Sequence, residues 1–220
     1  MDSGIWIYII WTIGAGALGL IISAIFAGIL HLRRSIFLVP YVLIIGFLLY
    51  CYYRWANLDL SELIIHNWLW GLIAALIATI LTVRNIFTQA SSPRPQGLRL
   101  VFEVLWFGVI YGALDGLYLS VLPVLVTWKA FPDLGGTILG KVCLGLLALI
   151  ASEFITIAYH AGYPEFRNSK IGMAAIGNGI FTLGYILSMN PISAVGAHLL
   201  MHVAAVWRGS EKTVQLPPHY

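Results

Sequence analysis

Hydrophobic positions along the chain gather in long runs separated by short polar segments. A run such as IWIYIIWTIGAGALGLIISAIFAGIL is long enough to cross roughly 30 Å of hydrocarbon as a helix, at about 1.5 Å per residue. Clusters of Arg, Pro, Asn and Asp divide the chain into seven predicted spans, at about residues 5–30, 36–53, 63–83, 99–127, 135–161, 171–188 and 192–207. The pattern therefore predicts an all-α, polytopic integral membrane protein with about seven transmembrane helices.

Composition supports this class, because 60% of the residues are hydrophobic and only 10% are charged, with a mean hydropathy of +0.90. A soluble domain carries about 25% charged residues. The first run lacks a basic segment before it and is longer than the apolar part of a signal peptide, so we expect a retained helix. Cys51 and Cys143 lie in apolar runs, where we expect buried thiols and no redox chemistry.

The longest break between runs is RNIFTQASSPRPQG, residues 84–97, which is typical of a flexible loop. It divides the chain into residues 1–97, with three helices and the loop, and residues 98–220, with four helices and a short tail. We expect a disordered terminus in the EKTVQ and PPHY segments. The alternative is that this tail docks a partner.

Basic residues fall mainly on one side of the predicted membrane. One side collects Arg33, Arg34, Arg84, Arg94, Arg99, Arg167, Lys170, Arg208 and Lys212, whereas the other has Arg54, Lys129 and at most Lys141. Because cytoplasmic loops retain Lys and Arg, the N-terminus is expected outside and the C-terminus in the cytoplasm. The predicted location is a cell membrane, which would be the plasma membrane in a prokaryote. The net charge of +3 is thus a topology signal, and no nucleic-acid partner is expected.

Four ionisable side chains lie in the runs near their predicted cytoplasmic ends: Glu103, His160, His198 and His202. Counting from the nearest arginine puts them roughly 6 to 15 Å below that surface. Asp115 and Glu153 lie deeper, as supporting partners or parts of a polar path. An ionisable residue inside a membrane is functional by default, so a common depth predicts a site.

Helical spacing puts His198 and His202 on one face, a geometry suited to holding one metal ion. His160 and Glu103 would complete a set of three histidines and one carboxylate, which suits zinc or another divalent ion. Asn178 is a candidate supporting contact. Other roles stay open: the histidines can bond to neighbouring helices or bind heme, and Glu103 can pair with Arg99 four residues away.

Residues 98–207 resemble the CAAX-protease and bacteriocin-processing intramembrane proteases, the CPBP or ABI family. The first family motif, two glutamates followed by an arginine and a glycine, is similar to FEVLWFG, with Glu103 retained and Phe102 and Phe107 at the first glutamate and arginine positions. The second family motif, an aromatic residue shortly before a histidine that ends a helix, resembles ITIAYHAG, in which the histidine is His160. The third resembles the run with His198, where His202 stands at the family's asparagine position.

The resemblance implies an intramembrane hydrolase in which Glu103, His160 and His198 activate water, with or without a metal, near the cytoplasmic face. The implied substrate is a membrane-embedded peptide or lipid. Loss of the glutamate and arginine positions supports an alternative, a non-catalytic membrane subunit or scaffold that binds a membrane protein or lipid. A heme protein with two histidine ligands is a third interpretation.

Two packing features complete the predictions. Gly177, Gly179 and Gly184 are expected to let the sixth span pack tightly against the histidine-bearing helices. Tryptophans near span ends are expected to be interface anchors, at positions Trp6, Trp55, Trp68, Trp128 and Trp207.

Overall fold

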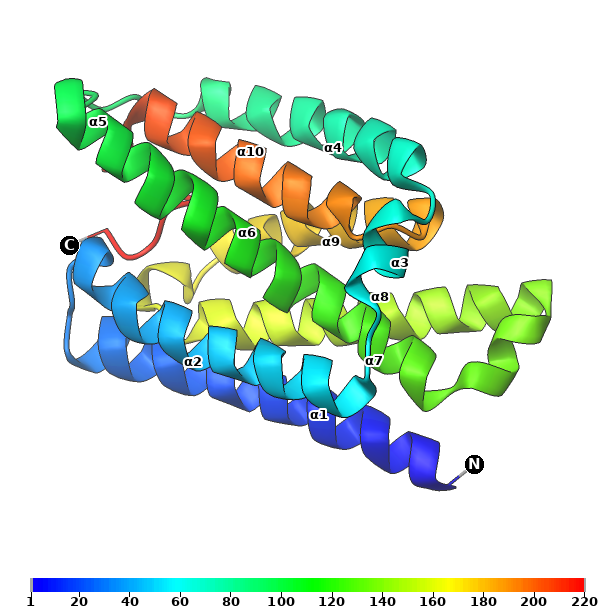
Figure 1. Cartoon of the computed structure of the whole chain (residues 1–220). Coiled ribbons are helices and arrows are strands. Elements are labelled where there is room, and N and C mark those ends of the chain that lie inside the picture. Colours follow the sequence, from blue (N-terminus) through cyan, green and yellow to red (C-terminus); the bar gives the residue numbers. More distant parts are fainter. Residues whose placement is uncertain (1, 220) are drawn as a thin grey trace.

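Helices make up nearly the whole chain in a computed structural model, which describes residues 2–219 (Figure 1). The first part contains α1 (Asp2–Ile22) continued by the π-helical η1 (Ser23–Ile29), α2 (Arg34–Ala56), α3 (Leu60–Ile65) and α4 (Trp68–Thr88). One long helix, here called the central helix, follows as α5 (Gly97–Glu103), π-helical η2 (Val104–Ile110), α6 (Tyr111–Asp115), π-helical η3 (Gly116–Val121) and α7 (Leu122–Ala130). The chain then forms the 3-10 turn η4 (Pro132–Gly136), α8 (Ile138–Ala161), the 3-10 turn η5 (Pro164–Phe166), α9 (Lys170–Ser188) and α10 (Ile192–Gly209).

Within residues 2–219, six helical stretches are long and apolar enough to cross a membrane. They are Ser3–Ile29, Arg34–Ala56, Trp68–Thr88, Gly97–Ala130, Ile138–Ala161 and Lys170–Ser188. They coincide with the first six predicted spans, so the prediction of an all-α, polytopic membrane protein is confirmed. The seventh predicted span corresponds to α10, which is not one of the six, since two histidines and Arg208 make it more polar.

The helices lie side by side in one bundle, with α10 in its interior (Figure 1). α10 packs on α4, on α9 and on the central helix, while α1 packs on α7 and α8. The loop before α2, the loop before α5 and the C-terminus lie at one end of the bundle, and the N-terminus lies at the other (Figure 1). Most basic residues are in or next to the loops of the first end, here called the basic end.

Close approach of the central helix to α10 depends on three glycines spaced four residues apart. A Cβ added at Gly108 would lie 2.8 Å from Val203 Cγ2, one at Gly112 would lie 2.8 Å from Leu199 Cα, and one at Gly116 would lie 2.7 Å from Val195 Cα. Real Cβ atoms essentially never approach this closely. Small residues on one helical face let two backbones approach, as is typical of membrane helices. This contact brings Asp115 of the central helix next to the histidines of α10.

The prediction of tight packing at the sixth-span glycines is wrong. A Cβ at Gly177 would meet nothing within 4 Å, and one at Gly184 would make only ordinary contacts at 3.7–3.8 Å. Gly179 faces the side chain of Glu153 at 3.0 Å, which can move aside. The close contacts instead fall in the central helix, which lies at the middle of the bundle and needs to accommodate neighbours on several sides.

The C-terminal tail is ordered against the bundle, so the expectation of a disordered terminus is wrong. Gly209, at φ +119°, ends α10 and turns the chain back along the basic end. Thr213 and Leu216 are fully buried, and the Val214 amide donates to Gln89 Oε1 at 3.1 Å. His219 holds the end of the tail, with Nδ1 3.0 Å from Glu165 Oε1.

Residues at the bundle surface include four of the five tryptophans expected at the interface, Trp6, Trp55, Trp68 and Trp207, while Trp128 is half-buried. Neither cysteine forms a disulfide; Cys51 is half-buried and Cys143 is exposed. The expectation of a buried thiol is therefore wrong for Cys143, because α8 turns that face away from its neighbours.

Candidate functional site

All three predicted site histidines line one cavity of about 320 Å³, here called the histidine cavity. His198 and His202 come from α10, His160 from the end of α8, and Asp115 from the central helix. His198, His202 and Asp115 are buried, at 3%, 2% and 4% exposure. The predicted supporting residue Asn178, on α9, also lines the cavity. Thr82 and Asn85 of α4 line it as well, so five helices contribute polar side chains to one space inside an apolar bundle.

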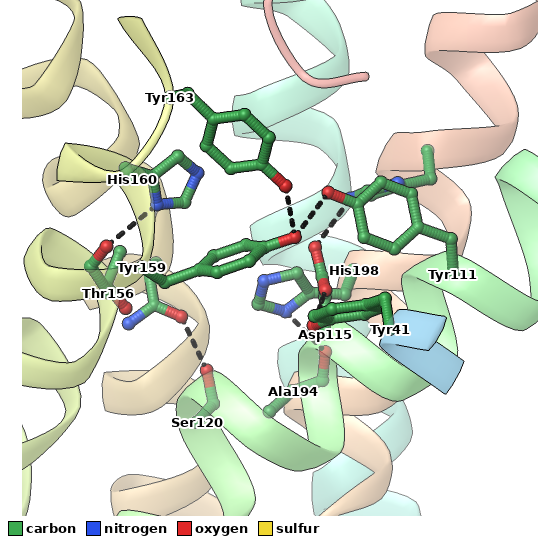
Figure 2. A network of polar contacts seen from close by, with 12 residues as sticks. Tyr41, Tyr111, Asp115, Ser120, Thr156, Tyr159, His160, Tyr163, Ala194 and His198 are labelled. Atoms are coloured by element: carbon green, nitrogen blue, oxygen red, sulfur yellow. Dashed lines mark hydrogen bonds and ion pairs between the residues drawn. The ribbon is translucent and has the colours of Figure 1, made fainter. Parts of the chain in front are cut away.

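Backbone carbonyl groups fix the orientation of two of these histidines. His160 Nδ1 is 2.8 Å from the carbonyl oxygen of Thr156, and His198 Nδ1 is 3.3 Å from that of Ala194. A carbonyl oxygen only accepts, so in the neutral rings Nδ1 carries the proton and Nε2 is left as an acceptor. The His198 ring also packs on Phe181, with centroids 4.3 Å apart. Figure 2 shows Nε2 of His198 turned away from Ala194 toward the space below Tyr159.

Asp115 joins α2 to α10 across the central helix. Its Oδ1 accepts a hydrogen bond from the Tyr41 hydroxyl, and its Oδ2 lies 3.6 Å from His202 Nε2. That distance is too long for a hydrogen bond, although contacts of catalytic groups often shorten when substrate binds. His202 Nδ1 is buried and has no hydrogen-bond partner among the described residues.

Buried tyrosines form a chain of hydroxyl groups that reaches the cavity (Figure 2). Tyr163 donates to the Tyr159 oxygen at 2.6 Å, and the Tyr159 and Tyr111 oxygens are 2.9 Å apart. Tyr111 lines the histidine cavity. If Tyr159 donates to Tyr111, the Tyr111 proton is left to point at a molecule in the cavity. The tyrosine chain can therefore supply a hydrogen-bond donor beside acceptor histidines.

A second network of small polar side chains fixes Asn178 at the cavity wall. Ser120 donates to Asn178 Oδ1 at 2.9 Å, and Asn178 Nδ2 donates to Ser152 Oγ at 2.7 Å. Thr182 bonds to both serines, at 2.7 and 3.0 Å. These contacts tie α8, α9 and the central helix together. Glu153 is half-buried beside Gly179, and its Oε1 has no hydrogen-bond partner among the described residues.

Glu103 does not line the histidine cavity with His160, His198 and His202. It lines another cavity of about 570 Å³ at the basic end, here called the basic pocket, with Arg33, Arg34, Ser35, Arg99, Phe102, Phe107, Ser210, Glu211, Pro218 and His219. Its Oε1 accepts from Arg99 Nε at 3.2 Å, and its Oε2 accepts from Ser210 at 2.9 Å. The pairing with Arg99 that the spacing allowed is thus present.

A zinc ion is bound by three or four protein ligand atoms directed at one position. Among residues 2–219, no three His, Cys, Asp or Glu side chains are grouped closely enough to hold a metal ion. The rings of His198 and His202 have centroids 6.3 Å apart, and Glu103 lies in the basic pocket. These residues do not fit a zinc site in this arrangement, so no chemical step below involves a metal.

The histidine cavity is also bordered by apolar side chains of α4 and α9 and by the C-terminal tail. Between α4 and α9 it is lined by Leu81, Met173 and Ile176, which are 53%, 48% and 70% exposed on the bundle surface. This side faces the hydrocarbon that surrounds a membrane protein. At the basic end the cavity is lined by Val214, Gln215 and Pro217 of the tail.

The residues that sequence reasoning missed are the tyrosines. Tyr111 lies four residues before Asp115 in one helix, so the two share a helical side. That spacing is visible in the sequence and could have identified Tyr111, whereas Tyr163 lies beyond the end of α8 at Ala161 and carries no such signal. Tyr41 carries no such signal, because it comes from α2 and meets Asp115 only in the folded bundle.

Comparisons with models of known families, with curated proteins and with solved structures find no match to this chain.

Proposed function

We propose that this protein is an intramembrane hydrolase whose general base is His198. The observation that carries the proposal is the histidine cavity, where acceptor nitrogens from α8 and α10 meet a buried carboxyl group and a tyrosine donor from the central helix. Cavities of roughly 300 to 1,000 Å³ are typical of small-molecule sites. Ionisable groups inside membrane helices are energetically costly, so their presence here favours a functional role.

In the proposed reaction, His198 Nε2 takes a proton from water, which attacks the carbonyl carbon of the substrate. The carbonyl oxygen gains negative charge and is stabilised by the Tyr111 hydroxyl, which the tyrosine chain holds in position. As the tetrahedral intermediate collapses, the protonated His198 ring gives this proton to the leaving nitrogen or oxygen. The neighbouring pair of Asp115 and His202 can take up the second proton of the attacking water, which the new carboxylic acid carries. A histidine base contributes about 10²- to 10⁴-fold to a rate.

The substrate is proposed to be a membrane-embedded peptide or a lipid ester that enters between α4 and α9, where apolar side chains border the cavity. We take the basic end as cytoplasmic, because basic residues gather there. The similarity of the His160 and His198 segments to CPBP motifs supports hydrolysis. In this proposal Glu103 has no part in the reaction, because it is paired with Arg99 in the basic pocket.

The test is hydrolysis by the purified full-length protein in proteoliposomes, with a fluorescence-quenched peptide containing an apolar segment and with a fluorogenic lipid ester. We expect His198→Gln to lower the rate of cleavage about 10²- to 10⁴-fold. His66→Gln is the control, because His66 is exposed and does not line the histidine cavity. Absence of cleavage by folded wild-type protein, or equal rates in both variants, would contradict the proposal and favour the non-catalytic alternative.

A further inference from the structure

The basic pocket contains a buried arginine that forms no ion pair with an Asp or Glu side chain among residues 2–219. Arg34, the first residue of α2, is 8% exposed, and its Nε has no hydrogen-bond partner among the described residues. Its guanidinium lies over the ring of Phe107, 5.4 Å from the centroid. A guanidinium offers several N–H donors in a rigid fork, and burial without an anion to accept from them is unfavourable.

The start of α2 also favours an anionic ligand. This helix has 23 residues, and its N-cap, Arg33, makes no side-chain capping bond. Free N–H groups at a helix N-terminus and the helix dipole both favour an anion. Ser35 in the first turn also lines the basic pocket, and its hydroxyl can donate to a bound oxyanion.

The charged side chains that line the basic pocket among the described residues leave a positive excess. Three arginines line it, Arg33, Arg34 and Arg99, against the carboxylates Glu103 and Glu211. Glu103 is already engaged by Arg99 and Ser210. The Arg99 side chain is 75% exposed, so most of its guanidinium can reach a second anion. A phosphate group suits this arrangement, because arginine pairs bind phosphate through two parallel hydrogen bonds.

The position of the basic pocket favours a lipid headgroup over free phosphate as the ligand. It lies at the basic end and is lined by Phe102, which is 52% exposed, and by Arg99, which follows the 88% exposed Leu98 in the chain. Exposed apolar side chains next to arginines are expected where lipid headgroups meet hydrocarbon. Basic pockets between membrane helices on the cytoplasmic side bind anionic lipid headgroups. We propose that the basic pocket binds the phosphate of an anionic phospholipid, held by Arg34, Arg33 and the N-terminus of α2.

The experiment is thermal unfolding of the full-length protein in neutral detergent during titration with phosphatidylglycerol, phosphatidylcholine or inorganic phosphate. We expect phosphatidylglycerol to raise the Tm saturably and phosphatidylcholine to have no such effect. Arg34→Gln and Arg33→Gln should each weaken the apparent affinity about tenfold or more. Arg54→Gln, an exposed arginine at the other end of the bundle, should leave it unchanged.

Three results would overturn the proposal. An equal rise in Tm with phosphatidylcholine would show that the protein does not distinguish an anionic lipid from a zwitterionic one. An equal shift with inorganic phosphate alone would assign the site to a soluble phosphate instead of a lipid. If Arg33→Gln and Arg34→Gln bound phosphatidylglycerol with wild-type affinity, the basic pocket would not be the binding site. If Arg34→Gln does not fold, the affinity of the exposed Arg33→Gln variant alone tests the assignment. None of these outcomes depends on hydrolysis in the histidine cavity.

Discussion

Replacing Gly112 by alanine tests the contact that builds the candidate site. The new Cβ would lie 2.8 Å from Leu199 Cα and 3.0 Å from the His198 carbonyl oxygen, whereas ordinary contact begins at 3.4 Å. Both neighbours belong to the backbone of α10, so that helix has to recede by about 0.6 Å, the difference between 3.4 and 2.8 Å. Overpacking of this kind costs about 1–3 kcal/mol.

The matched control is Gly177→Ala, because a Cβ there meets nothing within 4 Å. Both changes add one methyl group inside a helix, where alanine is favoured over glycine by up to about 1 kcal/mol. We expect Gly112→Ala to lower the free energy of unfolding in detergent by about 1–3 kcal/mol and Gly177→Ala to leave it equal or higher. The reasoning would be refuted if Gly112→Ala were as stable as Gly177→Ala.

Three further predictions follow from other contacts. Asn178→Ala should lower the free energy of unfolding by about 0.6–1.7 kcal/mol, since it removes bonds to Ser120 and Ser152; the exposed Asn85→Ala is the control, and equal losses would mean that the buried network adds nothing. Removal of residues 213–220 should speed maleimide labelling of Met201→Cys in a protein without Cys51 and Cys143, because the tail lines the histidine cavity; an unchanged rate would rule out the tail as a cover. Hydrogen bonds from Ser61 and Glu62 lower the pKa of Asp59 below 3.8, so its capping of α3 should hold above that pH and weaken as pH falls below it. The protection of the Ser61 and Glu62 amides from hydrogen exchange, taken relative to the intrinsic rate at each pH, should then fall, and Asp59→Asn should abolish this loss of protection.

Much of the fold could be predicted, because each long apolar run is a local signal of a helix that crosses a membrane. Residues 36–53 and 171–188, for example, fall within α2 and α9. Polarity along the chain also indicated His160, His198, His202 and Asp115, which share one cavity. Counting residues from the nearest arginine could not place Glu103 correctly. It bonds to Ser210 just beyond α10, eight residues after His202, so it lies nearer the basic end than the histidines.

Contacts between distant segments could not be predicted from local pattern. The Tyr41–Asp115 bond joins α2 to the central helix, and the tail residue Gln215 reaches the histidine cavity from beyond α10. The glycines that matter for packing were likewise misassigned, since twenty-two glycines offer several stripes and only the helix arrangement selects Gly108, Gly112 and Gly116. The two π-helical segments around Asp115 also carry no recognisable sequence signal, although such segments are frequent at functional sites.

Incorporation of ¹⁸O from labelled water into the cleavage product tests the central claim most directly. Wild-type protein in proteoliposomes should place one ¹⁸O atom in the new carboxyl group of the quenched peptide or lipid ester, and His198→Gln of equal thermal stability should form this product about 10²- to 10⁴-fold more slowly. Product formation at the wild-type rate by His198→Gln, or no labelled product from folded wild-type protein, would contradict the assignment of the histidine cavity as a hydrolase site.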